Sequence, residues 1–414
     1  MERPYGVLGR KLGHSYTPAI YRALAGLRYE RFEVEPEDLE SFIRGDAWEG
    51  VNVTIPYKRA VIPYLDELSD IAAKLGNVNT ITRLPDGRLR GDNTDYFGFS
   101  TLADRTGIDV SGKTVLVLGG SGGAGSTAMQ VLRDRGARPV AVGRSGVVTY
   151  DNLDAYAHAA VIVNCTPVGM YPQCPDAPCT LEGFDALEAV IDIVYNPART
   201  GIMLEAERRG IPAVGGLLML VAQAAQAVER YTGAPVDRQQ IADVTDALSA
   251  TEQNIALIGM PGSGKTRVGQ RLAALLGREH IDADVFFQQR YGIGCADFIE
   301  REGEASFREA ETACLRQLGS RSNLIISCGG GVVTRPENYK LLHQNSRIVM
   351  LDRPLAELSS KGRPISARDG VERLAQQRMA TYLAWADTVV ASRSCAEQTA
   401  RAVRSLLPTM LPHR

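Results

Sequence analysis

The sequence lacks the apolar segments that mark membrane and secreted proteins. It contains no run of eighteen or more apolar residues, and it begins Met1-Glu-Arg-Pro-Tyr-Gly, without the apolar core of a secretory signal. Its seven cysteines are odd in number and scattered, with no C-x-x-C pair, which favours reduced thiols over disulfides or a zinc site. We therefore expect a cytoplasmic protein without a membrane-spanning helix.

The sequence also lacks an excess of either charge. Its 46 lysines and arginines nearly balance 48 aspartates and glutamates, which gives a net charge of −2. Such a balance provides no general attraction for nucleic acid or an anionic membrane, so any anion site must be a local cluster. We expect small molecules as partners, with neither nucleic acid nor membrane. At 414 residues, of which 44% are hydrophobic, the chain has the length of two or three globular domains.

A phosphate-binding loop is the most specific motif in the chain. The apolar stretch 255–258 leads directly into Gly259-Met-Pro-Gly-Ser-Gly-Lys-Thr266, a complete G-x-x-x-x-G-K-T. In this motif, backbone N–H groups surround two phosphates, the lysine reaches the terminal phosphate and the hydroxyl binds Mg²⁺. Residues 267–276 follow with apolar side chains at helical spacing, and the start of a helix favours anions. The second part of the chain is therefore predicted to bind a nucleoside triphosphate.

A second glycine loop indicates a dinucleotide. Residues 113–118 read as a buried parallel strand, and Gly120, Gly122 and Gly125 then form G-x-G-x-x-G before a helix and another strand. The first glycine is predicted to make the tight turn, the second to admit the pyrophosphate and the third to let helix and strand pack closely. Where an NAD-binding sequence places an acid after the second strand, this chain has Gly-Arg144-Ser. An arginine there favours the 2′-phosphate of NADP.

Polar side chains follow several strands in the first part of the chain. Ser15 and Thr17 lie between a short strand and a helix, where hydroxyls and helix N–H groups bind a carboxylate, although a simple N-cap is the alternative. Lys58 follows the strand 50–55, a position suited to chemistry, although many such lysines are solvated. Asparagines and aspartates in two further loops add to these groups. Together they predict a pocket that recognises hydroxyl groups.

Acidic and glycine-rich turns follow two strands of the second part. Asp282 and Asp284 end one of them, and at strand period both point the same way, so that one reaches the Mg²⁺ shell and the other an acceptor hydroxyl. A solvated turn is the alternative. Three glycines at 329–331 follow the strand 324–328 and allow a close approach to a ligand, although a tight turn alone would explain them. The basic segment 359–370 suits a lid over phosphates.

The first part of the chain resembles shikimate dehydrogenase. The resemblance covers about residues 1–235 and rests on G-H-S-Y-T-P, N-V-T-I-P-Y-K, G-N-V-N-T, G-D-N-T-D, the glycine loop, N-C-T-P-V-G-M-Y-P, V-Y-N-P and G-G-L-L-M-L-V-A-Q-A-A, in family order. It implies reduction of 3-dehydroshikimate by NADPH, with Lys58 as the catalytic residue and Asp95 as its partner. The implied substrate-binding residues are Ser15, Thr17, Thr54, Lys58, Asn79, Asp95, Tyr195 and Gln223. The implied NADP site consists of Gly120, Ser121, Gly122, Gly123, Ala124, Gly143, Arg144, Ser145, Ile193 and Gly216.

Lys58 and Asp95 suit this reaction chemically. When hydride reaches a ring ketone, an ammonium group close to the developing alkoxide stabilises its charge and supplies a proton. A neighbouring carboxylate keeps the lysine charged and oriented. One departure concerns the first loop, where the family often has two serines and this chain has Ser15 and Thr17. The resemblance implies that relatives with threonine also accept quinate, so quinate stays an alternative substrate.

The second part resembles shikimate kinase over about residues 253–410. The shared motifs are G-M-P-G-S-G-K-T, D-A-D, G-E-A-S-F-R-E-A-E, G-G-G, R-P and R-x-x-x-Y. The implied ATP site consists of Gly262, Ser263, Gly264, Lys265, Thr266, Arg267 and Arg363, with Thr266 and Asp282 at the magnesium ion. The implied shikimate site consists of Asp284, Arg308, Gly329, Gly330, Gly331 and Arg378. Asp284 would orient or deprotonate the acceptor hydroxyl, Lys265 and Arg363 would act on the phosphoryl group, and paired arginines suit a carboxylate.

These observations predict an α/β protein in which a two-lobed dehydrogenase, with an α/β substrate domain and a Rossmann NADP domain, precedes a P-loop α/β/α kinase domain. The predicted boundaries are 1–101 and 216–240 for the substrate domain, 102–215 for the Rossmann domain, 241–253 for a linker and 254–414 for the kinase domain. The junction is placed where the chain turns polar and alanine-rich, without a clear buried face.

The predicted function is a bifunctional enzyme of aromatic biosynthesis that uses NADP(H), ATP and Mg²⁺. It would act on 3-dehydroshikimate and shikimate as a monomer or homodimer. The alternatives are a quinate/shikimate dehydrogenase, a kinase for nucleoside monophosphates, and a catalytically dead regulator that senses a metabolite. The regulator is less favoured because Lys58, Asp95, Lys265 and Asp284 are all present, and no DNA-binding module is visible in the sequence.

Overall fold

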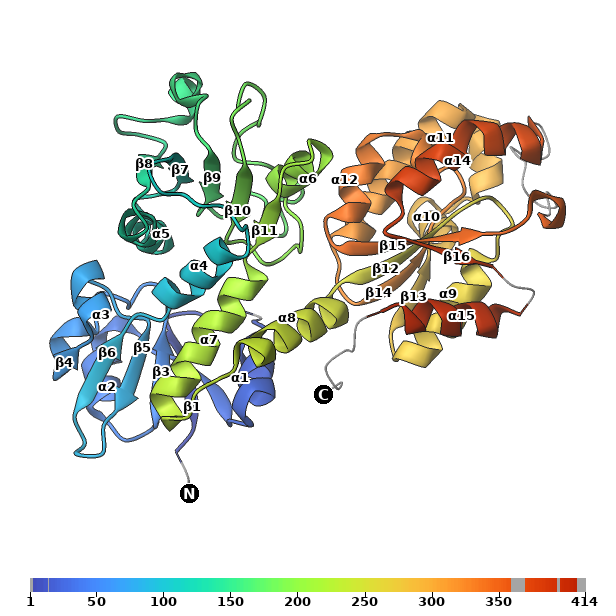
Figure 1. The fold of residues 1–414 in the computed structure, drawn as a ribbon. Coiled ribbons are helices and arrows are strands. Elements are labelled where there is room, and N and C mark those ends of the chain that lie inside the picture. The colour runs from blue at the N-terminus through green and yellow to red at the C-terminus, as the bar shows by residue number, and fades with distance from the viewer. Residues whose placement is uncertain (1–2, 14, 359–368, 393–394, 408–414) are drawn as a thin grey trace.

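The computed structural model describes residues 3–13, 15–358, 369–392 and 395–407 of the chain. Three β-sheets, each with its own helices, follow one another along these residues. Figure 1 shows the first two sheets, in blue and green, on one side of the molecule and the third, in yellow to red, on the other. Within the described ranges, none of the helices combines the length and the apolarity that crossing a bilayer requires. The predicted α/β class is confirmed.

The first sheet is mixed, with the strand order β2-β1-β3-β5-β6-β4. β3 pairs parallel with β1 and antiparallel with β5, so the carboxyl end of β3 lies beside the start of β5. Its elements are β1 (Tyr5–Gly9), α1 (Thr17–Ala25), β2 (Tyr29–Glu33), η1 (Pro36–Asp38), α2 (Leu39–Arg44), β3 (Gly50–Val53), η2 (Ile62–Tyr64), β4 (Glu67–Leu68), α3 (Asp70–Leu75), β5 (Thr80–Arg83) and β6 (Leu89–Asp92).

The second sheet is fully parallel, with the order β11-β10-β9-β7-β8. All five residues of its inner strand β7, between β9 and β8, are buried, as expected for a parallel sheet that helices cover on both faces. Its elements are α4 (Asp95–Asp104), β7 (Thr114–Leu118), α5 (Gly123–Asp134), β8 (Arg138–Val142), η3 (Tyr150–Tyr156), β9 (Val161–Asn164), β10 (Ala189–Asp192), α6 (Gly201–Arg208) and β11 (Ala213–Gly215). The predicted strand at 113–118 is thus confirmed.

Helix α7 (Leu217–Thr232) returns the chain to the first sheet. It packs closely on α4, because a Cβ atom on Gly98 would lie only 2.8 Å from the carbonyl oxygen of Met219. The start of α4 and the middle of α7 therefore lie next to each other between the first two sheets (Figure 1). This contact brings residues near 95 and 223 into one region of the molecule.

The stretch predicted to lack a buried face forms a regular helix, α8 (Arg238–Glu252). The Asp237 side chain caps its start by accepting a hydrogen bond from the Gln239 backbone N–H at 3.2 Å. Ile241, Val244 and Leu248 are buried against α1 and α7. Residues 241–252 of the predicted linker 241–253 therefore belong to a packed helix, and this helix leads into the third sheet (Figure 1).

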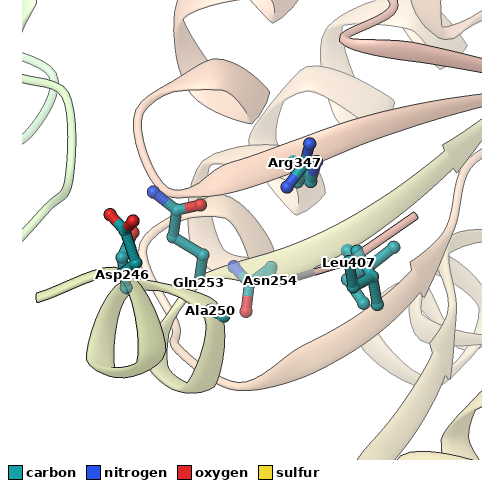
Figure 2. A pocket seen from close by; sticks show the side chains of 8 residues that line it. Asp246, Ala250, Gln253, Asn254, Arg347 and Leu407 are labelled. Atoms are coloured by element: carbon teal, nitrogen blue, oxygen red, sulfur yellow. The ribbon is translucent and has the colours of Figure 1, made fainter. Parts of the chain in front are cut away.

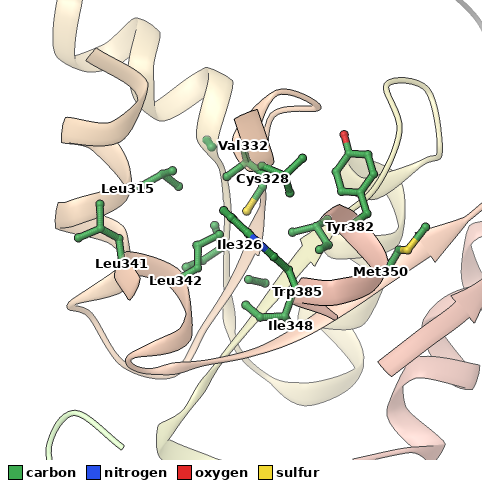
Figure 3. Packing of buried hydrophobic residues seen from close by; sticks show 14 of the residues in the cluster. Leu315, Ile326, Cys328, Val332, Leu341, Leu342, Ile348, Met350, Tyr382 and Trp385 are labelled. Atoms are coloured by element: carbon green, nitrogen blue, oxygen red, sulfur yellow. The ribbon is translucent and has the colours of Figure 1, made fainter. Parts of the chain in front are cut away.

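The third sheet is parallel, with the order β13-β14-β12-β15-β16. Alternate residues of its strands are buried under helices on opposite faces; Figure 3 shows the core on one face. Its elements are β12 (Asn254–Ile258), α9 (Lys265–Leu276), β13 (Glu279–Asp282), α10 (Ala283–Tyr291), α11 (Cys295–Gly319), β14 (Leu324–Ser327), η4 (Val332–Thr334), α12 (Glu337–His343), β15 (Ser346–Asp352), η5 (Leu355–Glu357), α14 (Val371–Trp385), β16 (Thr388–Ala391) and α15 (Ala396–Ser405).

A pocket lies where the end of α8 meets the first residues of β12 and β15 (Figure 2). The phosphate-binding loop follows the other end of β12, so the pocket belongs to the opposite edge of the sheet. It marks the junction between α8 and the third sheet rather than a nucleotide site. Its lining residues are Asp246, Ser249, Ala250, Gln253, Asn254, Ile255, Arg347 and Leu407.

Candidate active sites

Lys58 and Asp95 form an ion pair between the first two sheets. Lys58 lies in the turn after β3, and Asp95 is the first residue of α4. The Lys58 Nζ lies 2.5 Å from the Asp95 Oδ2, and the two side chains are 23% and 14% exposed. The helix dipole favours a carboxylate at the start of a helix, which is the position of Asp95. Asp95 can therefore hold the Lys58 side chain in place. The structure therefore brings together the two residues that the sequence selects for proton transfer.

Three hydroxyl groups from two distant loops meet near the start of α1. The Ser15 Oγ and the Thr17 Oγ1 lie 2.6 Å apart. The Tyr195 hydroxyl, from the loop after β10, lies against Ser15; burial raises the pKa of that phenol, and the contact with Ser15 lowers it only in part. Ser15 in addition accepts a hydrogen bond from the Thr17 backbone N–H at 3.2 Å. The N-cap of α1 is Tyr16, without a capping bond from a side chain, so Ser15 is not the N-cap residue.

Asn79 and Gln223 meet at Thr94, which the sequence interpretation missed. The Asn79 Oδ1 accepts a hydrogen bond from the Thr94 backbone N–H at 2.7 Å, and the Thr94 hydroxyl lies 3.4 Å from the Gln223 Oε1. Thr54 lies just after β3, where its backbone N–H donates to the Leu8 carbonyl oxygen at 2.9 Å. These residues line the same region as Lys58. Thr94 is one residue before Asp95 in the G-D-N-T-D motif, and that position was the signal for it.

The glycine loop after β7 has the close contacts that a dinucleotide site requires. A Cβ atom on Gly125 would lie 2.2 Å from the Gly119 carbonyl oxygen, so only glycine lets α5 pack against the turn. The tight turn itself is made by Gly119, with φ of 74°, one residue before the predicted Gly120. Gly120 is instead restricted by Ala141, whose Cβ lies 2.8 Å from a Cβ built on the glycine. Ser121, Gly122 and Gly123 are exposed at the start of α5, with Ala124 half-buried behind them.

The remaining predicted dinucleotide residues lie at the same edge of the second sheet. Gly143, Arg144 and Ser145 follow β8, next to the glycine loop, because the Gly119 N–H donates to the Val142 carbonyl oxygen at 2.8 Å. The arginine and the serine are exposed. Gly216 packs on the backbone of Ile193, since a Cβ on the glycine would lie 2.0 Å from the Ile193 carbonyl oxygen. A cofactor fits this arrangement: glycines where a pyrophosphate approaches, and an exposed cation where a 2′-phosphate would lie.

The loop that carries Tyr195 is held by the buried carboxylate of Asp192, at the end of β10. Asp192 accepts hydrogen bonds from the Thr200 hydroxyl at 2.6 Å, the Val194 N–H at 2.9 Å and the Asn164 amide at 3.1 Å. Burial raises the pKa of Asp192 to about 6, against the lowering effect of these hydrogen bonds. The protonated folded form is therefore favoured, so this group contributes stability below pH 3.8 that is lost as the pH rises through about 6.

We expect Asp192→Asn to remove this pH dependence. The free energy of unfolding of the wild-type chain should fall relative to that of the variant between pH 4 and pH 7, by at most roughly 3 kcal/mol, since each unit of pKa difference is worth about 1.4 kcal/mol. Urea unfolding at several pH values measures it. The exposed Asp154→Asn variant, also in the second sheet unit, is the control. Parallel stability curves for wild type and Asp192→Asn would contradict the assignment.

The phosphate-binding loop joins β12 to α9 in the predicted form. Gly259, Gly262 and Gly264 all have positive φ, which glycine adopts without strain. The Lys265 ammonium folds back over the loop and donates to the Gly259 and Met260 carbonyl oxygens at 2.8 and 3.0 Å. Ser263 and Gly264 lie between these residues, and Ser263 is buried. Arg267 is exposed in the first turn of α9.

Asp282 and Asp284 differ from the prediction in their local structure. The helix α10 begins at Ala283, so the two acids do not lie at strand period. Asp282 caps that helix by accepting a hydrogen bond from the Asp284 N–H at 3.0 Å, and it also accepts one from the Thr266 hydroxyl at 2.6 Å. A Cβ atom on Gly329 would lie 3.1 Å from the Asp284 Oδ1. Asp282 therefore lies at the phosphate loop, and Asp284 lies beside the glycine turn.

The three glycines of the turn after β14 contact both predicted arginines. A Cβ on Gly331 would lie 2.0 Å from the Arg308 Nη1, and the Gly330 carbonyl oxygen accepts a hydrogen bond from the Arg378 Nη1 at 3.0 Å. Arg378 also lines a cavity with Glu304 of α11 and Trp385 of α14. The glycine turn thus brings the two guanidinium groups to one place, where a small carboxylate would be held by charge-assisted hydrogen bonds.

Two further residues of this site were not assigned from the sequence. Glu311 is buried and accepts a hydrogen bond from the Arg308 Nη1 at 2.8 Å; burial raises the pKa of Glu311, and Arg308 lowers it. The Tyr382 hydroxyl donates to the Gly330 carbonyl oxygen, and its ring lies in the core shown in Figure 3. Their helical spacing from Arg308 and Arg378 was the available signal. Arg363 and the rest of 359–368 lie outside the described residues.

The fold and the two sites define a dinucleotide-dependent oxidoreductase joined to a P-loop phosphotransferase. Residues 7–81 match the family model of the shikimate dehydrogenase substrate binding domain, and residues 261–408 match that of shikimate kinase. The chain belongs to the shikimate dehydrogenase family through its first part and carries a shikimate kinase domain in its second. It is therefore a bifunctional enzyme of the shikimate pathway, with a dehydrogenase and a kinase in one chain.

The relatives found among known proteins match the first part. The shikimate dehydrogenase (NADP(+)) of Clostridium beijerinckii is 36% identical over 256 residues, which are 57% of this chain and 94% of that protein. A chorismate mutase/shikimate 5-dehydrogenase fusion protein from Clostridium acetobutylicum has a TM-score of 0.55 at 34% identity, over 59% of this chain and 97% of its own. Shikimate 5-dehydrogenase from Thermus thermophilus, in complex with NADP(H) and shikimate, has a TM-score of 0.53 at 32% identity, over 59% and 98% of the two chains.

Proposed function

We propose that the first part of the chain reduces 3-dehydroshikimate to shikimate with NADPH, and that the second part phosphorylates shikimate with ATP and Mg²⁺. The observation that carries the first activity is the 2.5 Å contact between Lys58 and Asp95, which lie between the first two sheets. The kinase activity is supported by the position of Asp284 and two arginines at the glycine turn, near a P-loop. Both sites would recognise the same small carboxylated ring, which makes the product of one reaction the substrate of the other.

In the dehydrogenase site, Lys58 would donate the proton that the new hydroxyl requires. Bound NADPH would supply the hydride. The ammonium group would stabilise the developing alkoxide and then protonate it, while Asp95 holds the lysine in position. Ser15, Thr17 and Tyr195 would bind the substrate carboxylate through their converging hydroxyls. Thr54, Asn79 and Gln223 would contact the ring hydroxyls from the opposite side.

NADP rather than NAD is the proposed dinucleotide. The exposed Arg144, directly after β8, offers a positive charge at the position where an NAD site offers an acid. Ser145 adds a hydroxyl next to it. Two of the relatives described above support the same choice: the Clostridium beijerinckii protein is named for NADP(+), and the Thermus thermophilus structure holds NADP(H). The loop residues 120–124, with Gly143, Ile193 and Gly216, would contact the rest of the cofactor.

In the kinase site, the proposed roles follow from position in the loop. Lys265 and residues 262–264 would hold the phosphates, and Thr266 with Asp282 would hold Mg²⁺, which would offset part of the phosphate charge. Asp284 would orient or deprotonate the acceptor hydroxyl. Arg308, Arg378 and the glycines 329–331 would bind shikimate through its carboxylate. Arg267 and Arg363 would complete the ATP site.

We also propose the division into units and the setting of the protein. The substrate domain would comprise 1–101 and 216–240, the Rossmann domain 102–215, the linker 241–253 and the kinase domain 254–414, and most of the linker would be the helix α8. The small-molecule chemistry and the cysteine pattern favour a cytoplasmic enzyme. It would act as a monomer or homodimer, without nucleic acid as a partner.

One experiment tests both activities together. The purified chain, supplied with 3-dehydroshikimate, NADPH, ATP and Mg²⁺, should form shikimate 3-phosphate, and it should stop at shikimate when ATP is left out. Replacing shikimate by quinate in the reverse reaction with NADP⁺ tests the broader substrate range that Thr17 suggests. Replacing it by a nucleoside monophosphate in the kinase reaction tests the other acceptor. Ligand binding without turnover in every assay would support a dead regulator and contradict the proposal.

A further inference from the structure

Arg199 links the dehydrogenase to the kinase. It lies in the loop 193–200, four residues after Tyr195. Its backbone N–H donates to the Gln344 carbonyl oxygen at 2.8 Å, and its guanidinium donates to the carbonyl oxygens of His343 at 2.7 Å and Ser346 at 2.8 Å. The side chain is 20% exposed. Three fixed carbonyl oxygens hold this arginine, so the loop cannot shift without breaking several hydrogen bonds.

A second contact reaches the other substrate loop. The Asn345 side chain accepts a hydrogen bond from the Ala198 N–H at 3.4 Å and donates to the Ser322 Oγ at 3.1 Å. Ser322 also lies against the hydroxyl of Tyr16, the residue between Ser15 and Thr17. The rings of Tyr16 and Tyr195 lie 5.4 Å apart. The kinase therefore contacts both loops whose hydroxyls converge in the dehydrogenase site.

These contacts use the edge of the kinase sheet opposite the phosphate loop. Ser322 precedes β14, and Asn345 immediately precedes β15, so both lie where strands begin. The phosphate loop follows the end of β12, a strand of five residues, which places the two edges about 16 Å apart at about 3.3 Å per residue. Figure 1 shows α6 and α12 facing each other at this junction. The kinase can thus support the dehydrogenase without exposing its own nucleotide site to it.

We propose that the amino-terminal edge of the kinase sheet positions the two dehydrogenase loops, 15–17 and 193–200, that bind the substrate carboxylate. The inference rests on the proposed function of the first part. Tyr16, Arg199 and Ser322 are positioning residues: they touch no reacting atom, but they fix Ser15 and Tyr195 before substrate arrives. Pre-ordered loops lose less conformational entropy on binding, so the kinase domain lowers the KM for shikimate in the dehydrogenase reaction.

Tyr16→Phe and Ser322→Ala test this inference, because each removes one hydroxyl from the contact. Both should raise the KM for shikimate about three- to tenfold, the amount expected when one polar contact is lost. The kcat, the KM for NADP⁺ and all kinase parameters should stay within twofold. The double variant should be no worse than Ser322→Ala, because that variant alone removes the contact with Tyr16 as well as the hydrogen bond from Asn345. Ser320→Ala, two residues away, should have no effect, because the Ser320 hydroxyl donates to the Gln317 carbonyl oxygen of its own helix end.

Arg199 gives an independent test. Arg199→Ala should raise the KM for shikimate more than Ser322→Ala does, and Arg199→Lys should give an intermediate value, because lysine keeps the charge but not the planar set of donors. If the unaltered chain oxidises no shikimate with NADP⁺, the proposed function fails. If it does, but Ser322→Ala behaves like Ser320→Ala, the inference alone fails. Equal changes in the KM values for shikimate and NADP⁺ would also overturn it, since they would indicate a general loss of structure.

Discussion

Replacing Lys58 by alanine is expected to lower the kcat for shikimate oxidation by a factor of about 10² to 10⁴. The Lys58 ammonium lies 2.5 Å from Asp95 and is the proposed proton donor in the reduction, and thus the proton acceptor in the reverse direction. Without it, the reaction loses both the charge opposite the alkoxide and the group that transfers the proton. Initial rates of NADPH formation at saturating shikimate measure the effect.

The second activity of the chain is an internal control for this prediction. The kinase kcat of Lys58→Ala should equal that of the wild type, which would exclude unfolding as the cause. Lys74→Ala is a matched control, because Lys74 is a surface lysine that also pairs with an aspartate, Asp134, at 2.7 Å. Lys58→Arg separates the two roles, since arginine keeps a positive charge but does not release a proton near neutral pH. A kcat within twofold of wild type for Lys58→Ala would remove the residue from the mechanism.

The sequence predicted structure correctly where the function and the backbone conformation depend on a few adjacent residues. Both glycine loops follow strands that are buried along their whole length, β7 and β12, and precede helices, as predicted. Such loops are recognisable because a few adjacent residues determine the turn, the approach of a phosphate and the packing of the helix. Even there, the turn residue is Gly119 rather than Gly120, because consecutive glycines leave the position of the turn open.

The sequence was insufficient where burial depends on distant elements. Helix α8 looked polar because its apolar residues, Ile241, Val244 and Leu248, are few. Their spacing of three and four residues is that of one helix face, but the surface that covers them comes from α1 and α7, which lie far away in the chain. Asp282 was expected to continue a strand, yet it caps α10, because an aspartate competes well for the free N–H groups of a helix start.

The junction between the two enzymes was not predictable from single residues. Arg199 follows the V-Y-N-P motif and reads as an ordinary surface arginine, and Ser322 reads as part of a polar turn. Their role depends on how the third sheet is placed after α8. In this arrangement the first residues of its strands face the dehydrogenase loops. The pairing of Arg308 with Glu311 was equally unpredictable, because a helical spacing of three residues allows such an ion pair but does not require it.

Replacing Asp284 by asparagine should lower the kcat of the kinase by a factor of about 10² or more and leave the KM for ATP within about twofold. Asparagine has the same shape, so the loop geometry is kept, but it neither accepts the proton of the acceptor hydroxyl nor carries the charge that orients it. Asp284 lies beside Gly329, whereas Asp282 is the acid that bonds to the Thr266 hydroxyl of the phosphate loop, which is why ATP binding should be spared. Steady-state phosphorylation of shikimate, with each substrate varied in turn, separates the two parameters.

Asp282 provides the contrasting variant for this prediction. Because Asp282 accepts the hydrogen bond from the Thr266 hydroxyl, Asp282→Asn should raise the Mg²⁺ concentration needed for half-maximal rate, an effect that Asp284→Asn should not show. Asp297→Asn, on the exposed first turn of α11, should change neither value, and the dehydrogenase kcat should be the same in all three variants. If Asp284→Asn phosphorylates shikimate at the wild-type rate, the acid that activates the acceptor hydroxyl must be sought elsewhere. Asp282 would then be the first candidate, since it lies at the phosphate loop itself.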